Sequence, residues 1–474
     1  MFSTPTPLQM RLIVLLWLLL TLPMALFLGY GSDPDAWIMA HTGERMLEAG
    51  RYISSRTTGF PLMEGWMALA AWLGGGAALS NLLSVFSGVM LLLGLGQLAR
   101  GGAFRHPLAV ILTIALMPMM LKNGASSMDY LPAMALMTWA YAKLRDDQPY
   151  VAALLIGAAC GFRPTSGLYA LPAMAWILVQ GGGFKLAMRV FLIAFFTGMA
   201  AFSPSLYTYG IPLSVTSDIP LAAKKLILIG GYHFLNFLGH AQSLIVWPLL
   251  AWLLWRRRAA GEKLSANPDV ALHLTVIASW LLLYMLSPLE PEYLIPMLPS
   301  LIMLLDQLAT GRAFVALCAL LLFNHVGNID TLGGVSGHRY VELSLKPGYL
   351  YRDIQDRRFK LSFRAAANAY HPQQPTLLMY GDLWMAPHNP AWRKHPDGDL
   401  KMLCQVDGKL CLRRPVQERE HFEKLKQMGY RMVLWSGRNW EYAATGNTIW
   451  REYVEVVDSL DDFFGRPIVG RPIQ

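Results

Sequence analysis

The sequence predicts an α-helical polytopic membrane protein that ends in a soluble α/β domain. Three observations lead to this prediction. The 474 residues are 54% hydrophobic and only 15% charged, and the mean hydropathy is +0.36. Long apolar runs recur up to about residue 327. After residue 328 they give way to charged residues, Asn, Gln and Pro. Because a soluble core cannot absorb so many apolar runs, the composition excludes an ordinary soluble protein.

Apolar runs define the predicted membrane region, residues 1–327. A spanning helix needs about 20 apolar residues, and along this chain that rule predicts about eleven spans. The first run has no small-x-small cleavage site and is predicted to be a retained anchor. The run at 60–73 is shorter and is predicted to lie against the membrane or dip into it. The predicted spans lie near 10–30, 79–99, 105–121, 128–144, 149–161, 165–180, 188–207, 228–255, 268–288, 293–309 and 312–327.

The distribution of Lys and Arg predicts the orientation. The net charge of +9 is spread over short clusters between apolar runs, so it indicates orientation more than a nucleic-acid partner. One set of alternate loops is richer in basic residues and is therefore predicted to be cytoplasmic. This set holds Arg11, Arg100, Arg105, Lys143, Arg145, Lys185, Arg189, Arg256 to Arg258, Lys263 and Arg312. The large first loop, 31–78, and everything after residue 328 are then predicted to lie outside the cytoplasm.

Residues 328–474 are predicted to form a soluble extracytoplasmic α/β domain. The stretch "TLLMYGD" is typical of a buried strand, "REHFEKLKQMGY" of an amphipathic helix ending at a glycine, and "RMVLWSG" of a second strand. In "CQVDGKLC", Cys404 and Cys411 flank an Asp-Gly turn, which favours a hairpin disulfide in an oxidising compartment. Two unpaired cysteines in a surface loop are the alternative.

Two aspartates begin the first outer loop. Asp33 and Asp35 flank Pro34, and the apolar residues that follow have helical spacing, so we expect an amphipathic helix with both aspartates at its N-terminal end. Helix capping explains one aspartate. The second is a candidate general base, because partial burial beside a membrane tunes a carboxylate easily.

The rest of the loop adds Arg51, Arg56 and Glu64. Arginines on this side oppose the positive-inside rule, and a phosphate group would explain them because the guanidinium fork matches it. A solvated loop with local ion pairs is the alternative.

Three other outer boundaries carry polar candidates. "KNGASSMDY" contains Lys122 and Asp129, "CGFRPTSG" contains Arg163, and "EPEYLIPMLP" contains Glu292 and Tyr293. Each can be a cap or a snorkelling side chain, or can grip an anionic head group. Their shared side of the membrane favours a common site.

His233, Asn236 and His240 are spaced as one face of the predicted span at 228–255. That face is either a structural hydrogen-bonding seam or part of a groove for a polar head group or metal ion. Two histidines are a weak metal signal. No metal ligands are assigned, no cofactor is certain, and a divalent metal ion is left open. No Walker loop, Rossmann fingerprint, CxxC pair or HExxH motif occurs.

The combination of "SDPDAW", "ERMLEAGRYISSR" and "GFPLMEGW" with the later Asp129, "FRPTSG" and "EPEYLIPMLP" resembles the GT-C class of integral-membrane glycosyltransferases. This class includes protein O-mannosyltransferases, aminoarabinose transferases of lipid A and arabinofuranosyltransferases. The resemblance covers about residues 10 to 327. Relatives often carry adjacent acids where Pro34 intervenes here, which leaves open whether Asp33 or Asp35 is the base.

The resemblance implies an inverting glycosyltransferase with a polyprenyl-phosphate sugar donor. It also implies a glycan, lipid or protein acceptor on the non-cytoplasmic face of a bacterial inner membrane. Arg51, Arg56, Lys122 and Arg163 would contact phosphate by position. The chemistry fits these residue types, since a carboxylate can take the acceptor proton while cations hold the departing phosphate. A transporter or flippase of a lipid-linked substrate and an O-antigen-type polymerase or ligase are the alternatives.

Overall fold

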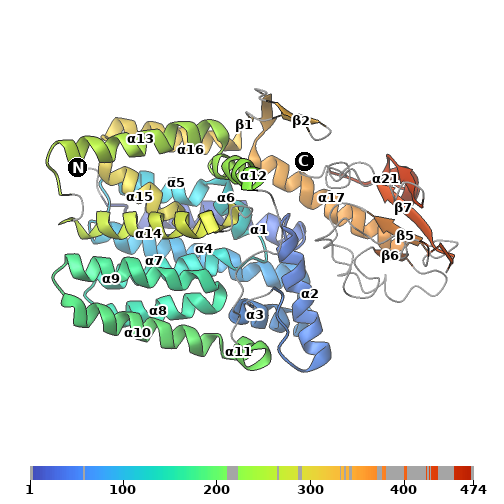
Figure 1. Cartoon of the computed structure of the whole chain (residues 1–474), viewed down its shortest axis with the longest axis horizontal. Helices are drawn as coiled ribbons and strands as arrows, with labels where there is room; N and C mark the ends of the chain where they lie inside the picture. The colour runs from blue at the N-terminus through green and yellow to red at the C-terminus, as the bar shows by residue number, and fades with distance from the viewer. Residues whose placement is uncertain are drawn as a thin grey trace.

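The computed structural model consists of a bundle of helices followed by small β-sheets (Figure 1). It describes residues 4–56, 59–210, 223–263, 266–286, 291–330, 333–335, 338–340, 344–370, 376–379, 400–402, 423, 426–427, 429–435 and 453–470.

Proline begins many helices of the bundle, as Pro34, Pro61 and Pro149 do, because its fixed φ and missing N–H suit a first turn. The helices and 3₁₀ turns are α1 (Pro7–Phe27), α2 (Pro34–Ala49), α3 (Pro61–Trp72), α4 (Gly76–Arg100), α5 (Pro107–Leu116), α6 (Pro118–Gly124), α7 (Tyr130–Arg145), α8 (Pro149–Phe162), η1 (Pro164–Tyr169), α9 (Ala170–Val179), α10 (Gly183–Ala201), α11 (Ser203–Tyr209), α12 (Ala223–Asn236), α13 (His240–Ala259), α14 (Pro268–Leu286), η3 (Pro291–Met297), α15 (Leu298–Leu308), α16 (Gly311–Leu322) and η4 (Phe323–His325).

Several of these helices can cross a membrane. Within the described residues, α1, α4, α10 and α14 are long and apolar enough, and the number rises to 6 if each of two bent pairs counts as one span. Three shorter apolar helices lie at Pro149–Phe162, Pro164–Val179 and Gly311–His325. Most of the remaining predicted spans thus correspond to shorter or broken helices.

Two predicted spans are not single straight helices. The span expected at 105–121 bends by 59° between α5 and α6, where Met117 is extended because Pro118 follows it. The span expected at 228–255 bends by 89° between α12 and α13. Gly239 at this break has φ +98°, which favours glycine. The single helix face expected for His233, Asn236 and His240 was therefore wrong.

Basic side chains hold helix ends together on the side of the bundle that is predicted to be cytoplasmic. At one end, the guanidinium of Arg145 binds Asp269 and the carbonyl oxygen of Gly101, and Arg257 donates to the carbonyl oxygen of Leu308. We call this the basic end. Helix α7 runs from Asp129, at the opposite end, to Arg145. Basic residues that the sequence assigned to one side thus gather at one end of the bundle.

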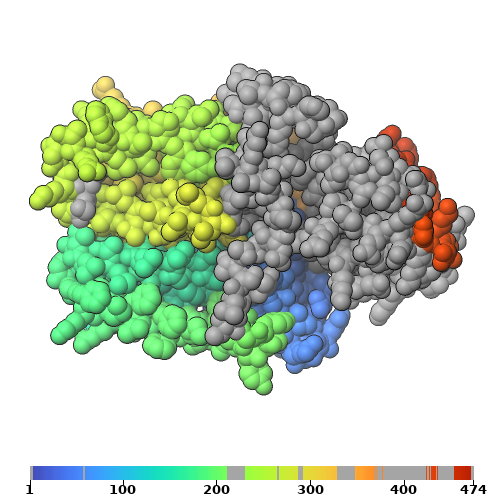
Figure 2. Space-filling view, in the orientation of Figure 1, coloured from blue at the N-terminus to red at the C-terminus, as the bar shows by residue number. Residues whose placement is uncertain are grey.

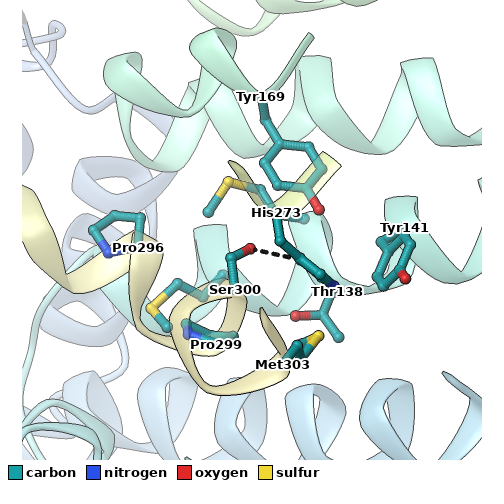
Figure 3. Close-up of a pocket in the computed structure, with 10 residues that line it drawn as sticks. Thr138, Tyr141, Tyr169, His273, Pro296, Pro299, Ser300 and Met303 are labelled. Atoms are coloured by element: carbon teal, nitrogen blue, oxygen red, sulfur yellow. Dashed lines mark hydrogen bonds between the residues drawn. The ribbon is translucent and has the colours of Figure 1, made fainter. Parts of the chain in front are cut away.

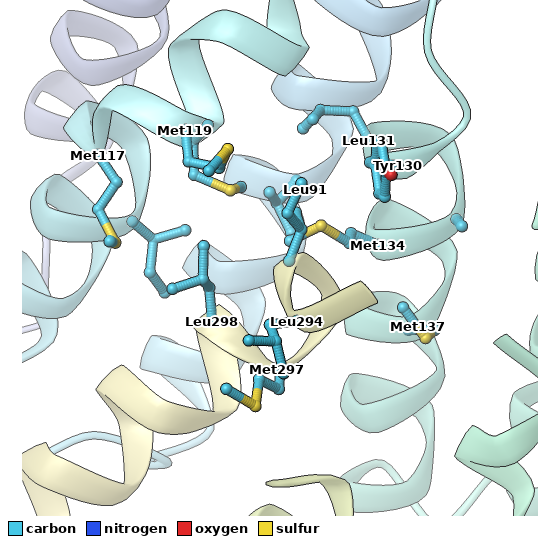
Figure 4. Close-up of a cluster of buried hydrophobic side chains, with 14 of the residues drawn as sticks. Leu91, Met117, Met119, Tyr130, Leu131, Met134, Met137, Leu294, Met297 and Leu298 are labelled. Atoms are coloured by element: carbon cyan, nitrogen blue, oxygen red, sulfur yellow. The ribbon is translucent and has the colours of Figure 1, made fainter. Parts of the chain in front are cut away.

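Methionine and leucine side chains fill the bundle interior where α4, α5, α7, η3 and α15 meet. Leu91, Met134, Met137, Leu294 and Leu298 are all at most 3% exposed and lie together (Figure 4). Flexible methionines fill the irregular gaps where short and bent helices meet. Helix α7 also packs against α4 and α8, and α8 against α10.

The described residues after the bundle form three sheets. β1 (Gly327–Asp330) pairs antiparallel with β4 (Ser344–Pro347), and β2 (Gly333–Val335) with β3 (His338–Tyr340). The third sheet is parallel, in the order β6-β5-β7-β8. Its strands are β5 (Thr376–Met379), β6 (Leu400–Met402), β7 (Arg431–Trp435) and β8 (Glu455–Val457). The strands predicted in "TLLMYGD" and "RMVLWSG" are confirmed. Cys404 and Cys411 lie outside the described residues.

Helix α17 (Tyr349–Ala369) connects the bundle to the parallel sheet, and the sequence analysis did not predict it. In Figure 1 it runs in orange from the bundle toward β5 and β7. Its Phe359 ring stacks on Trp435 of β7 at 5.6 Å between centroids, and Phe363 meets Phe464 of α21 (Leu460–Phe464) at 5.5 Å. Figure 2 shows the bundle and the red C-terminal residues at opposite ends of the molecule.

Candidate functional site

The first loop begins with a helix cap. Asp33 is the N-cap of α2, and one of its side-chain oxygens accepts a hydrogen bond from the backbone N–H of Asp35 at 2.9 Å. Pro34 takes the first helical position. Capping therefore accounts for the side chain of Asp33, and Asp35 stands in the first turn with its carboxylate directed elsewhere.

Asp35 belongs to a chain of alternating charges with Arg56, Asp129 and Arg163, which we call the charge network. One guanidinium nitrogen of Arg56 binds Asp35, and the other donates to Oδ1 of Asp129 at 3.3 Å. Nη1 of Arg163 donates to Oδ2 of the same Asp129 at 2.7 Å. Asp129 precedes α7 but makes no side-chain cap. The network thus joins α2, the loop before α3, the start of α7 and the end of α8.

The network runs from a partly open to a closed environment. The side chains of Asp35 and Arg56 are 31% and 24% exposed, whereas those of Asp129 and Arg163 are 0% and 3% exposed. Burial alone would lower the pKa of Arg56, but the carboxylates of Asp35 and Asp129 outweigh it and raise that pKa above its ordinary value. Both arginines therefore stay charged.

Aromatic rings flank the two arginines. The guanidinium carbon of Arg163 lies 4.0 Å from the ring centre of Tyr130 and 5.5 Å from that of Tyr293, and that of Arg56 lies 3.9 Å from Phe60. The Nε atoms of Arg56 and Arg163 are buried and have no hydrogen-bond partner within the described residues. Each arginine therefore keeps a donor that an anionic ligand could use.

Lys122 and Glu292 lie close to the network. The charges of Asp33, Glu292 and Asp353 all act on Lys122, whose Nζ donates to the hydroxyl of Tyr349 at 3.4 Å. Tyr349 opens α17, far along the chain, and sequence reasoning missed it. No local signal marks it, because a tyrosine after Pro-Gly is ordinary in a loop.

Glu64 shapes the loop that carries Arg56. Its buried carboxylate accepts hydrogen bonds from the hydroxyl of Tyr52, from the backbone N–H of Phe60 at 2.9 Å and from the N–H and Oγ of Ser55 at 2.6 and 2.5 Å. Burial and the charge of Glu64 raise the pKa of Tyr52. Glu64 therefore holds a turn in place, and its carboxylate is directed at the loop itself.

Of the predicted site residues, Arg51 lies apart from the charge network. Arg51 is exposed and follows the C-cap Gly50 of α2. It is separated from Asp35 by the length of that helix, about 24 Å at 1.5 Å per residue. His233 lies near the end of α12, with its ring 5.6 Å from that of Tyr232.

A small cavity lies deeper in the bundle, lined by residues that include Tyr141, Tyr169, His273, Ser300 and Met303 (Figure 3). His273 Nδ1 lies 3.3 Å from the hydroxyl of Ser300. Tyr141 is twelve residues beyond Asp129, or about 18 Å along α7. The cavity therefore extends away from the charge network, beginning at Met134, five residues beyond Asp129 on α7.

The donor set favours an anion over a metal cation. Within the described residues, no group of three or more His, Cys, Asp or Glu lies close enough together to hold a metal ion. The carboxylates of the network face arginines, which already neutralise them. Arg56, Arg163 and Lys122 are instead suited to phosphate oxygens.

Comparison with known proteins gives a weak likeness to a solved structure. No family model and no curated protein matches the sequence. Among solved structures, the crystal structure of ArnT from Cupriavidus metallidurans bound to undecaprenyl phosphate is similar to this chain. The TM-score is 0.46 and the identity is 15%, over 96% of this chain and 90% of that one. A likeness at this level does not establish a function.

Proposed function

We propose that the protein is an inverting glycosyltransferase of the GT-C type. It transfers a sugar from a polyprenyl-phosphate donor to a glycan, lipid or protein acceptor on the non-cytoplasmic face of a bacterial inner membrane. The observation that carries this proposal is the charge network. It pairs an aspartate in the first turn of α2 with Arg56 and links that arginine through Asp129 to Arg163. Each arginine keeps a buried Nε donor.

The cations hold the donor phosphate. Arg163 and Arg56 present guanidinium groups, and Lys122 adds a third positive charge on the neighbouring α6. As the bond between sugar and phosphate breaks, negative charge grows on the departing lipid phosphate, and fixed cations stabilise it. The donor's lipid tail would remain in the bilayer, which explains why such a site stands at the end of a membrane bundle.

Asp35 acts as the general base. Inverting transfer needs a carboxylate to take the proton of the acceptor hydroxyl as that oxygen attacks the anomeric carbon. Asp33 is engaged as the helix cap, whereas the partly exposed Asp35 is oriented by Arg56. The region after residue 328 would help to select the acceptor.

Separate Asp35→Asn and Asp33→Asn variants test this proposal. Asparagine caps a helix about as well as aspartate, so Asp33→Asn should keep α2 and most of the activity. Asp35→Asn should lower transfer about 10²- to 10⁴-fold, the usual contribution of a general base. The measurement is transfer of label from radiolabelled polyprenyl-phosphate sugars by membranes that contain equal amounts of each variant.

Asp146→Asn is the matched control, because Asp146 pairs with Lys143 at the basic end of α7. It should transfer label like the wild-type protein. Full activity of Asp35→Asn would show that Asp35 is not the general base. No transfer by the wild-type protein from any polyprenyl-phosphate sugar would remove the glycosyltransferase proposal.

A further inference from the structure

Helix α17 buries a face made of charged residues. Asp353, Asp356, Arg357 and Lys360 are each at most 1% exposed, at the spacing i, i+3, i+4 and i+7 of one helix face. Two are acidic and two basic, so the face is neutral overall. It packs toward α6 and the first loop, while Phe359 and Phe363 pack on the C-terminal elements.

Part of this face holds the start of the first loop. The hydroxyl of Ser32 donates a hydrogen bond to Oδ1 of Asp353, and Nζ of Lys360 donates to the carbonyl oxygen of Ser32. Lys360 also pairs with Asp356 at 3.0 Å. Ser32 immediately precedes Asp33, so these bonds fix the segment from which α2 starts.

Arg357 connects that segment to a second one. Its Nε donates to Oδ2 of Asp353 at 2.8 Å. Its Nη1 donates to the carbonyl oxygen of Ala125 at 2.8 Å, and its Nη2 to the carbonyl oxygen of Lys122 at 3.1 Å and to Oγ of Ser126 at 2.5 Å. One guanidinium therefore holds the C-terminal turn of α6, where Lys122 lies, and orients the carboxylate that holds Ser32.

Packing alone does not explain these charges. Desolvating an ion pair is costly, and apolar residues of similar volume often replace buried pairs without loss of stability. Here the donors and acceptors reach the two segments that carry Asp33 and Lys122. A hydrophobic face could pack against these segments, but it could not fix their backbone carbonyl groups in one arrangement.

We propose that Arg357 is a positioning residue of the candidate site. It holds the start of α2 and the turn of Lys122 in register and touches no substrate itself. The expected effect of Arg357 on the affinity for a lipid phosphate rests on the proposed function. The structural part of its role can be measured separately.

The first test is hydrogen exchange on the full-length protein in nanodiscs. In Arg357→Gln, exchange should rise in peptides that cover 28–40 and 119–129 and stay unchanged in α8 and α10. Arg358→Gln is the matched control, because Arg358 is the exposed neighbour on the same helix and should change neither segment. A rise confined to α17 would overturn the proposal.

The second test is the affinity for undecaprenyl phosphate, measured on the folded fraction of the same variants. Arg357→Gln should bind about tenfold more weakly, by analogy with the outer partners of metal ligands. Arg357→Lys should recover thermal stability, since it keeps the ion pair with Asp353. It should not recover affinity, since an ammonium group lacks the fork that reaches both segments. A merely structural role would leave the affinity of the folded fraction unchanged.

Ser32→Ala provides a second test of the proposal if Arg357→Gln does not fold. It removes only the hydroxyl that donates to Asp353, and it should raise exchange in 28–40 and weaken lipid binding in the same direction. Wild-type affinity in both folded variants would overturn the positioning role and leave the proposed function intact. If the wild-type protein bound no undecaprenyl phosphate, the proposed function would fail, and the exchange measurement would still decide the positioning role.

Discussion

Asp129 is the residue on which the charge network depends. Its two oxygens bind two different arginines, and no part of its side chain is exposed. Two guanidinium partners compensate the charge of this buried carboxylate, whereas with only one of them it would be poorly compensated. The arginines proposed to bind a phosphate are therefore also the groups that compensate the buried charge of Asp129.

Removing Arg163 should be costly. Arg163→Met leaves buried Asp129 with Arg56 alone, and loss of one partner of a buried pair costs about 3–5 kcal/mol. The double variant Asp129→Asn/Arg163→Met should be more stable than Arg163→Met, because the uncompensated charge is gone. Lys143→Met breaks a partly exposed pair with Asp146 and should cost about 0–1 kcal/mol. Unfolding in detergent measures all three, and a double variant no more stable than Arg163→Met would contradict this view of the network.

At the level of elements, the close crossing of α2 and α3 sets where the loop between them can go. A Cβ atom at Gly43 would lie 2.5 Å from the carbonyl carbon of Met67 and 2.7 Å from the backbone nitrogen of Ala68. Both atoms belong to backbone, which cannot move aside as a side chain can. The two helices can therefore approach this closely only because residue 43 has no side chain.

Gly43→Ala should push α2 away from α3 and destabilise the protein by about 1–3 kcal/mol, as overpacking does. Gly65→Ala is the matched control, since Gly65 lies within α3 and a Cβ atom added there would meet nothing within 4 Å. It should stabilise the helix by about 0.5–1 kcal/mol. Thermal unfolding of the two variants should shift in opposite directions, and equal midpoints would contradict the close crossing.

Local patterns predicted elements whose causes are local. Pro34 with an acidic cap and helical spacing of apolar residues predicted the helix that the structure shows at Pro34–Ala49, and "RMVLWSG" predicted β7. The bend at Gly239 was missed because Asn236 and His240, on either side of it, were interpreted as one face of a continuous helix. Helix α17 was not predicted. Its many charged residues are typical of a surface exposed to water, and only their distant partners show why they are buried.

The same limit applies to the site. Residue type and side of the membrane indicated that Asp35, Arg56, Asp129 and Arg163 share one end of the molecule, and in the structure they contact one another. Which acid caps and which one pairs depends on side-chain geometry that spacing does not contain. The contribution of Tyr349 depends on a contact 227 residues away from Lys122.

At the level of the whole molecule, the charge-derived orientation predicts which end faces the cell exterior. Arg51→Cys places a thiol at an exposed position after α2, and Glu262→Cys places one at the basic end. In a chain whose four native cysteines are replaced by serine, a membrane-impermeant maleimide should label residue 51 in intact cells. It should label residue 262 only after permeabilisation, and the reverse pattern would invert the topology.

The contacts of α17 also bear on when the site forms during synthesis. The bond from Ser32 to Asp353 spans 321 residues, and that from Lys360 to Ser32 spans 328. The first loop is therefore synthesised long before the helix that fixes it, and such distant pairings form late. A nascent chain released before about residue 360 would carry its membrane helices and its aspartates but lack an ordered site. Under the proposed function, activity would then begin only once α17 has been translated.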